Sequence, residues 1–184
     1  MPGQIIGQRN YPGGRVFQAV IGDLLDEPTD AIVNAANGHL AHGGGVAAAI
    51  ADAAGSALED EGDRLVKERG PIPTGGAVLT TAGRLRFKGV IHAVGPRMGD
   101  GREEDSLVSA LKAAFQIAGD KGWSSVSFPA ISSGIFAVPP ATCVKAYVRA
   151  VDEFFAASPE SSLKTIRLAL FKGAVADQIE QALR

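Results

Sequence analysis

The sequence predicts an α/β domain in which helices cover both faces of a sheet, and three observations lead to this prediction. Of the 184 residues, 46% are apolar and 21% are charged, as in ordinary folded chains. Short β-rich runs alternate with segments of helical periodicity, which is the pattern of layered α/β folds. No linker, repeat or low-complexity segment interrupts this alternation. Because a chain of this length can bury roughly 70% of its unfolded surface, we expect residues 1–184 to form one domain.

Six runs rich in β-branched and aliphatic residues predict a sheet of about six strands. They are residues 16–21, 30–33, 77–81, 90–94, 126–131 and 165–171. Only a short, basic, glycine-bounded segment separates 77–81 from 90–94, so we expect a hairpin or a pair of neighbouring strands. Residues 4–15 are left open, as either an edge strand or a mobile segment.

The segments between these runs predict helices. Small apolar residues favour a buried helix over 46–54, which continues or restarts over 56–69 and ends before Pro71. Apolar residues spaced by three and four over 107–118 predict a helix with one face on the core. Pro139 or Pro140 marks the start of the next helix. An amphipathic helix over 175–183 closes the chain.

Charge and cysteine content exclude several classes of protein. Lysine and arginine number 18 and aspartate and glutamate 20, a balance that argues against binding nucleic acid by bulk charge. Cys143 is the only cysteine, so an intramolecular disulfide and Cys-based zinc frameworks are absent. We expect a cytoplasmic protein without a membrane segment, because no signal region or apolar run of 18 residues occurs. His39, His42 and His92 are too few and too dispersed for a zinc site, so no metal or cofactor is expected.

The first candidate functional segment is a glycine-rich loop between the strand 30–33 and the helix that starts near Val46. Gly43, Gly44 and Gly45 let the backbone approach a ligand closely. The free N–H groups at the start of the helix suit an anion such as a phosphate. Because the loop has no lysine or arginine, its backbone amides would hold a diphosphate. The alternative interpretation is an ordinary tight connection, in which Asn37 caps a turn.

Two known phosphate-binding motifs are alternatives for this loop. A Walker loop requires Gly-Lys-Ser/Thr after its last glycine, whereas Val46 and Ala47 follow here. Residues 43–48 do satisfy the Rossmann dinucleotide pattern G-x-G-x-x-A. However, about nine residues separate Val33 from Gly43, and the expected acidic residue would fall inside a helix. The sequence therefore argues against an NAD-binding Rossmann enzyme, which stays a minor alternative.

The second candidate segment is the loop 129–136, which again lies between a strand and a helix. Loops at the carboxyl ends of strands form the ligand crevice of layered α/β folds, so two of them can clamp one ligand. Ser133 is not a nucleophile elbow, because no glycine stands two residues before it. Phe136 follows no apolar stripe and is suited either to the core or to a sugar face.

Three motifs together resemble the macro domain family: Gly22-Asp23, the stretch from Asp30 through Asn37 to Val46, and residues 132–136. Their order and spacing match, and the resemblance runs from about Val16 to the C-terminus. It implies a three-layer α/β/α sandwich with a mixed sheet that binds ADP-ribose in a cleft. No cofactor is implied, and we expect a monomer.

The resemblance implies a role for each matching residue. Asp23 would accept a hydrogen bond from the adenine amino group near the Leu24 amide, and Phe171 would lie against the adenine. These roles suit the residue types, because a carboxylate accepts from an amine but repels phosphate. Phe171 has a competing interpretation, since an aromatic residue that ends a central strand usually belongs to the core.

At the other end, Asn37 would bond the hydroxyls of the distal ribose, because its amide offers both a donor and an acceptor. The remaining residues would line this sugar and close over the diphosphate by their backbone amides, with Phe136 against the distal ribose. They are Gly43, Gly44, Gly45, Val46, Ser132, Ser133, Gly134, Ile135 and Phe136.

Macro domains either bind ADP-ribose only or also remove it from modified side chains or from O-acetyl-ADP-ribose. In one hydrolytic subgroup an acidic residue follows the Gly-Gly-Gly-Val run, where this chain has Ala47. Other hydrolytic members share the His-Gly-Gly-Gly-Val form, so His42 is a candidate catalytic residue beside Asn37, with an ordinary loop histidine as the alternative. We expect a hydrolase that acts on mono-ADP-ribosylated acidic side chains or O-acetyl-ADP-ribose; the alternative is a non-catalytic reader of ADP-ribosylated proteins.

Overall fold

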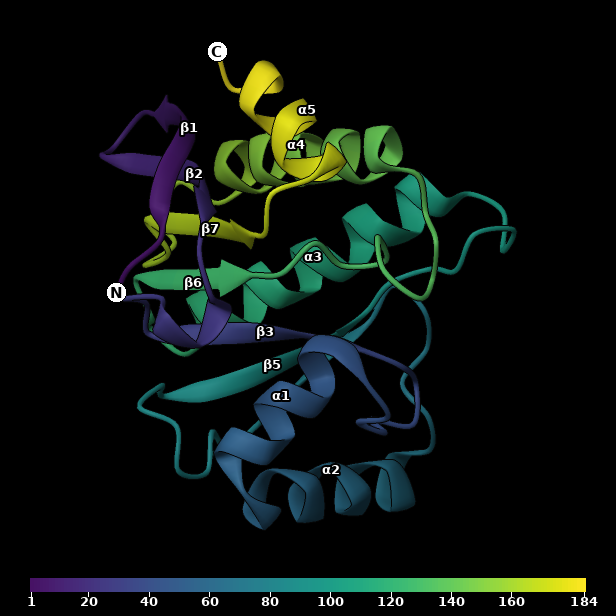
Figure 1. Ribbon diagram of the computed structural model, residues 1–184. Coiled ribbons are helices and arrows are strands. Elements are labelled where there is room, and N and C mark those ends of the chain that lie inside the picture. The colour runs from purple at the N-terminus through teal and green to yellow at the C-terminus, as the bar shows by residue number, and fades with distance from the viewer.

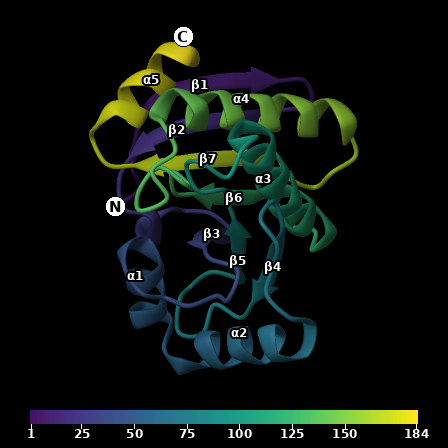
Figure 2. The ribbon, with the colours of Figure 1, turned by 90° about the vertical axis from the view of Figure 1, so that its right-hand side faces the viewer.

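The computed structural model describes all residues from 1 to 184. It contains one seven-stranded sheet in the order β1-β2-β7-β6-β3-β5-β4, with helices on both faces (Figures 1 and 2). The strands are β1 (Gln4–Tyr11), β2 (Arg15–Ile21), β3 (Ala31–Ala36), β4 (Ala77–Thr80), β5 (Gly89–Val94), β6 (Ser125–Phe128) and β7 (Thr165–Leu170). The helices are the short 3-10 helix η1 (Leu24–Asp26), α1 (Gly45–Ala54), α2 (Ser56–Arg69), α3 (Glu103–Asp120), α4 (Pro140–Ala157) and α5 (Ala174–Ala182).

The sheet is mixed, as expected from the resemblance. Strands β2, β7, β6, β3 and β5 are parallel, and β1 and β4 pair antiparallel at the two edges. The prediction of about six strands is one short, because residues 4–11 form the edge strand β1. Gly13 and Gly14, both with positive φ, make the turn that folds β1 back onto β2, so that Tyr11 pairs with Arg15.

Two strand boundaries differ from the prediction. Strand β3 runs to Ala36 and not to Val33, because Asn34, Ala35 and Ala36 pair with β5 although the asparagine is polar. Strand β6 ends at Phe128, because Pro129 has no N–H to donate to the ladder. The boundaries of the other predicted strands agree to within one residue.

The helices form the two outer layers of the predicted sandwich. On one face, α3, α4 and α5 pack on the sheet in a cluster of 33 buried apolar residues. On the other face, α1 and α2 cover a cluster of 10 built around Ile32, Ile50 and Leu58. Figures 1 and 2 show α1 and α2 on the side opposite to α4 and α5. Gly55, with φ 83°, separates α1 from α2, so the helix restarts and does not continue. No helix of the chain has the length and hydropathy needed to cross a membrane.

The parallel register decides where a ligand site can lie. Because β2, β3, β6 and β7 run in one direction, the segments that follow them leave the sheet at the same edge. These segments begin at Gly22, Asn37, Pro129 and Phe171. Motifs that lie far apart in the sequence therefore meet at one edge.

A buried ion pair holds the segment after η1 to the middle of the sheet. Glu27 is fully buried and accepts hydrogen bonds from Arg167 of β7 and from the Ser127 hydroxyl of β6, the latter at 2.9 Å. The side chain of Arg167 is 9% exposed and also donates to Gln18 of β2. Removal of either charge leaves the other one buried without a partner.

We expect Glu27→Gln to lower the free energy of unfolding by about 3–5 kcal/mol, the usual cost of breaking a buried pair. Urea denaturation followed by circular dichroism measures the loss. The matched control is Glu180→Gln, which removes an exposed pair with Arg184 and should change stability by less than about 0.5 kcal/mol. Equal stabilities for the two variants would show that the buried pair does not stabilise the fold.

Candidate functional site

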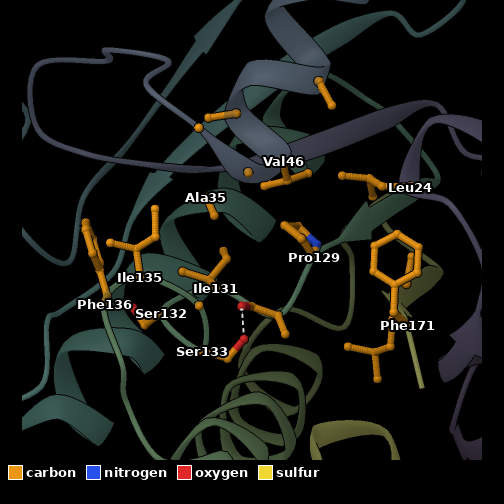
Figure 3. Close-up of a pocket in the computed structure, with 18 of the residues that line it drawn as sticks. Leu24, Ala35, Val46, Pro129, Ile131, Ser132, Ser133, Ile135, Phe136 and Phe171 are labelled. Atoms are coloured by element: carbon orange, nitrogen blue, oxygen red, sulfur yellow. Dashed lines mark hydrogen bonds between the residues drawn. The ribbon is translucent and has the colours of Figure 1, made fainter. Parts of the chain in front are cut away.

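A cavity of about 900 Å³ opens at the edge where the parallel strands end. Its volume lies in the range of small-molecule and cofactor sites. Each of the thirteen residues predicted to contact the ligand lines it. Figure 3 shows Phe171 and Leu24 at one end of this cavity and Phe136 and Ile135 at the other, with Ala35, Val46 and Ile131 between them. The two glycine-bearing loops thus share one groove, although 85 residues separate Val46 from Ser132.

The first loop turns an open row of main-chain groups toward the cavity. A Cβ atom added to Gly43, Gly44 or Gly45 would meet nothing within 4 Å, so contacts inside the protein do not explain the absence of side chains. Gly45 has φ +59°, which favours glycine, and begins α1. The N–H groups of Gly45, Val46 and Ala47 make no hydrogen bond in the protein. They are the free donors of the helix N-terminus and carry its partial positive charge.

The second loop presents a similar set of donors from the opposite side. The N–H groups of Gly134, Ile135 and Phe136 bind no group of the protein, and Gly134 has open space beside it. Ser132 adopts φ 68°, a strained value for a residue with a side chain. Its hydroxyl is buried without a partner, and the Ser133 hydroxyl donates to the Ala130 carbonyl at 2.7 Å, as the dashed line in Figure 3 shows.

The helix α4 fixes the second loop from below. The Tyr147 hydroxyl donates to the carbonyl of Pro129 and accepts from the Ile131 N–H at 3.2 Å. The Cys143 thiol lies 3.7 Å from the Ile131 carbonyl oxygen. Burial raises the pKa of Cys143 to about 11, so this thiol is protonated and serves packing. Gly95 completes the support, because a Cβ there would lie 2.2 Å from the Ser132 oxygen.

Asn37 lines the cavity, but its side chain is partly engaged by its own loop. Its Oδ1 accepts from the N–H groups of His39 and Ala41, both at 3.1 Å, and its Nδ2 donates to the Ala41 carbonyl. The turn-capping interpretation therefore holds as a description of the loop. One N–H of Nδ2 is left for a ligand, so this amide can offer a ligand a donor but no free acceptor.

Phe171 and Leu24 mark one end of the cavity (Figure 3), and Asp23, which precedes Leu24 in the chain, also lines it. Asp23 is exposed and caps η1, with Oδ1 accepting from the Leu25 N–H at 2.9 Å, so Oδ2 is free for a ligand donor. Phe171 follows the last residue of β7 and is 79% exposed. It therefore does not belong to the core, and its ring stands at the rim of the cavity (Figure 3). An aromatic face and a free carboxylate oxygen suit a nitrogen heterocycle with an exocyclic amine.

His42 does not line the cavity. Both of its ring nitrogens are buried without a hydrogen-bond partner, and its ring centroid lies 5.8 Å from that of His92. Its ring is thus turned toward the interior behind the glycine loop. The prediction that the three histidines are dispersed is wrong for this pair, although the structure contains no group of three His, Cys, Asp or Glu that could hold a metal ion.

His92 is buried in a polar chain between three strands. Asn34 of β3 lies 3.1 Å from Nδ1, and the Thr80 hydroxyl of β4 lies 2.8 Å from Nε2. Because Thr80 itself donates to the Thr81 carbonyl, its oxygen accepts from Nε2–H, and Nδ1 accepts from Asn34. Burial, with the nearby His42, lowers the pKa of His92 to about 3. The imidazole is therefore neutral at physiological pH and pins β3, β4 and β5 together.

Arg97 is a charged residue of the site that was not predicted from the sequence. Asp23 and Arg97 are the only ionisable residues that line the cavity. Arg97 comes just after β5, another parallel strand whose carboxyl end reaches the same edge. Asp23 and Phe171 were selected through the family resemblance, whereas the position of Arg97 after a parallel strand is the signal that could have selected it.

Comparison with known proteins places these loops in context. A family model described as the Macro domain matches residues 33–147. A Thermotoga maritima protein is 46% identical over 84% of the chain, which spans 26% of that protein. The O-acetyl-ADP-ribose deacetylase of Salmonella gallinarum is 42% identical, and the match covers 75% of this chain and 78% of that protein. Among solved structures, a mutant macrodomain of Oceanobacillus iheyensis with ADPR superposes with a TM-score of 0.87 at 27% identity, covering 96% of both chains.

The neutral state of His92 predicts how stability depends on pH. The ordinary pKa of a histidine, 6.5, applies to the unfolded chain, whereas the pKa of His92 in the folded chain is about 3. Between these two pH values the unfolded chain binds a proton at this histidine and the folded chain does not. The contribution of His92 to the free energy of unfolding should therefore fall as pH is lowered through this interval, by up to about 1.4 kcal/mol per pH unit.

Denaturation of the wild type and of His92→Gln between pH 7 and 4 tests this contribution, because the variant lacks the buried imidazole. We expect a steeper loss of stability for the wild type. Parallel curves would contradict the assignment of a neutral, buried His92.

Proposed function

The chain belongs to the macro domain family, and on that premise we propose that its cleft binds ADP-ribose and that it hydrolyses the ester between ADP-ribose and a carboxylate. The substrates would be mono-ADP-ribosylated aspartate or glutamate side chains of proteins and O-acetyl-ADP-ribose. The relative in Salmonella that bears the name O-acetyl-ADP-ribose deacetylase supports this choice of chemistry.

One observation carries the proposal: two sets of unpaired main-chain N–H groups face the same cavity. Gly45, Val46 and Ala47 supply one set, and Gly134, Ile135 and Phe136 supply the other. Such convergent donors suit the oxygens of a diphosphate, and the N-terminus of α1 adds a favourable dipole. The open space beside the glycines leaves room for the phosphates to approach the backbone.

The two ends of the cavity fix the direction of the ligand. Asp23 and Phe171 suit an adenine at one end, where the carboxylate is kept away from the phosphates. Asn37 and Phe136 then meet the distal ribose, with the free N–H of Asn37 donating to a sugar hydroxyl. The adenine-end carboxylate and the diphosphate-binding amides thus select ADP-ribose in a single orientation.

In the proposed reaction, water is held beside the diphosphate and attacks the anomeric carbon of the distal ribose. The bond from this carbon to the ester oxygen breaks, and the carboxylate leaves with the bonding electrons. The surplus proton of the water passes to a phosphate oxygen and then to solvent. His42 takes no part, because its ring nitrogens are buried away from the cavity. Positioning of the ribose and water supplies the rate enhancement.

A reader module without hydrolytic activity is the second candidate. It is favoured by the lining of the cavity, in which Asp23 and Arg97 are the only ionisable residues and neither is suited to act as a general base at the distal ribose. A reader would bind ADP-ribose and leave a modified glutamate intact. An NAD-dependent dehydrogenase receives no support, because six residues separate the end of β3 from Gly43 and the Rossmann glycine follows its strand directly.

We expect ADP-ribose at 100 times its dissociation constant to stabilise the protein by about 2.7 kcal/mol, which raises Tm by roughly 5–11 °C for this length. Differential scanning fluorimetry measures the shift, with adenosine as the control ligand because it lacks the diphosphate. If ADP-ribose did not raise Tm, both the hydrolase and the reader module would be contradicted.

Substitution at Asn37 tests the catalytic half of the proposal. Asn37→Ala should slow release of ADP-ribose from a mono-ADP-ribosylated glutamate peptide by about 10- to 100-fold, because the ribose loses its orientation. Asn37→Asp, which retains an acceptor for the loop amides but loses the donor, should also be slow. The matched control is His39→Ala, an exposed side chain of the same loop that does not line the cavity. If Asn37→Ala released ADP-ribose as fast as the wild type, Asn37 would have no role in the reaction. If the wild type released none, the hydrolytic proposal would fail and the reader module would be the function that the site supports.

A further inference from the structure

Arg97 is the only cation that lines the cavity, and its charge is unpaired. Its guanidinium makes no hydrogen bond and no ion pair with the protein. Other exposed arginines such as Arg64 and Arg69 are also unpaired, but they do not line the cavity. It lies over the ring of Phe136, with Cζ 4.9 Å from the ring centroid. A stacked guanidinium keeps the N–H groups along its edge free for an acceptor in its own plane.

The backbone holds Arg97 at one end of the cavity. Its N–H donates to Asp100 at 2.9 Å, and the next N–H, that of Met98, donates to the Phe136 carbonyl at 2.8 Å. The segment after β5 is thereby tied to the far end of the second loop. Because Phe136 and Phe171 stand at opposite ends of the cavity (Figure 3), Arg97 lies at the end away from the adenine-suited residues.

This inference rests on the proposed function. We propose that Arg97 is the specificity-determining residue for the leaving group: its guanidinium binds the carboxyl group through which ADP-ribose is attached to an acidic side chain. In the proposed complex the main-chain amides of the two loops bind the diphosphate. The arginine is then available to bind an anion beyond the distal ribose. The only anion that the reaction forms there is the carboxylate.

The chemistry of the step agrees with this placement. When the bond from the anomeric carbon to the ester oxygen breaks, negative charge grows on the two carboxylate oxygens. A planar guanidinium can donate to both oxygens at once, which an ammonium group cannot do. Arg97 therefore favours substrates linked through a carboxylate over those with an uncharged leaving group.

The test compares Arg97→Gln and Arg97→Lys in the full chain with a matched control, Lys172→Gln. Lys172 is an exposed cation between two cavity-lining residues, Phe171 and Gly173, but does not itself line the cavity. Its substitution removes the same charge near the opposite end. Three quantities are measured: the Kd for free ADP-ribose, kcat/KM for a mono-ADP-ribosylated glutamate peptide, and the ratio of kcat/KM for the acetate and fluoroacetate esters of the anomeric hydroxyl.

We expect Arg97→Gln to change the Kd for ADP-ribose less than threefold and to lower kcat/KM for the peptide about tenfold, as for the loss of a charge-assisted hydrogen bond. Arg97→Lys should lower kcat/KM for the peptide by less than Arg97→Gln does, and Lys172→Gln should leave it unchanged. The loss should be larger for the acetate ester than for the fluoroacetate ester, because the more basic carboxylate depends more on the arginine. If Arg97 had a purely structural role, its substitution would lower kcat/KM by the same factor for both esters.

Equal rates for Arg97→Gln and wild type would overturn this inference and leave the proposed function standing. A tenfold weaker Kd for ADP-ribose would overturn it as well, since Arg97 would then bind the diphosphate. If Lys172→Gln lowered kcat/KM for the peptide as much as Arg97→Gln does, the effect would come from the long-range attraction of a charged substrate, and the inference would be overturned. If wild type binds ADP-ribose but releases none from the peptide, the hydrolytic proposal and this inference both fail; if it binds none, the proposed function fails as a whole.

Discussion

Parallel pairing of β2, β7, β6, β3 and β5 is the constraint on which the rest of the structure depends. It brings the carboxyl ends of five strands to one edge, so segments from residue 22 to residue 171 line one cavity. The buried Glu27–Arg167 pair and the neutral His92 link neighbouring strands in the interior of the sheet. They stabilise the sheet on which the site depends.

The site uses main-chain groups where other phosphate sites use lysine or arginine. The glycines of the first loop meet no other atoms where a Cβ would stand, and the Tyr147 hydroxyl holds the second loop in place. Fixed amides need no rearrangement when the ligand arrives, which favours positioning over acid–base chemistry. The two charged residues that line the cavity, Asp23 and Arg97, are then free to bind groups at the two ends of the ligand.

Part of this arrangement was predictable from the sequence. The alternation of strands and helices predicted the layers, and the two glycine-bearing loops predicted a phosphate-binding crevice. The roles of the individual lining residues came from the resemblance to macro domains. The edge strand β1 was left open because its run is polar and interrupted by Gly7. The end of β3 was misplaced because an asparagine is typical of a loop, whereas the Nδ2 of Asn34 donates inside the sheet to His92, 58 positions away. Long-range hydrogen bonds of this kind leave no local signal. The inward turn of His42 left none either, because its ring packs near His92, 50 positions away in the sequence, without any hydrogen bond.

A crystal structure of the complex with ADP-ribose tests the central claim most directly. The account predicts diphosphate oxygens at about 2.7–3.2 Å from main-chain nitrogens of both Gly45–Ala47 and Gly134–Phe136, with the distal ribose beside Phe136. A diphosphate held by side chains, by one loop alone, or outside this groove would contradict it.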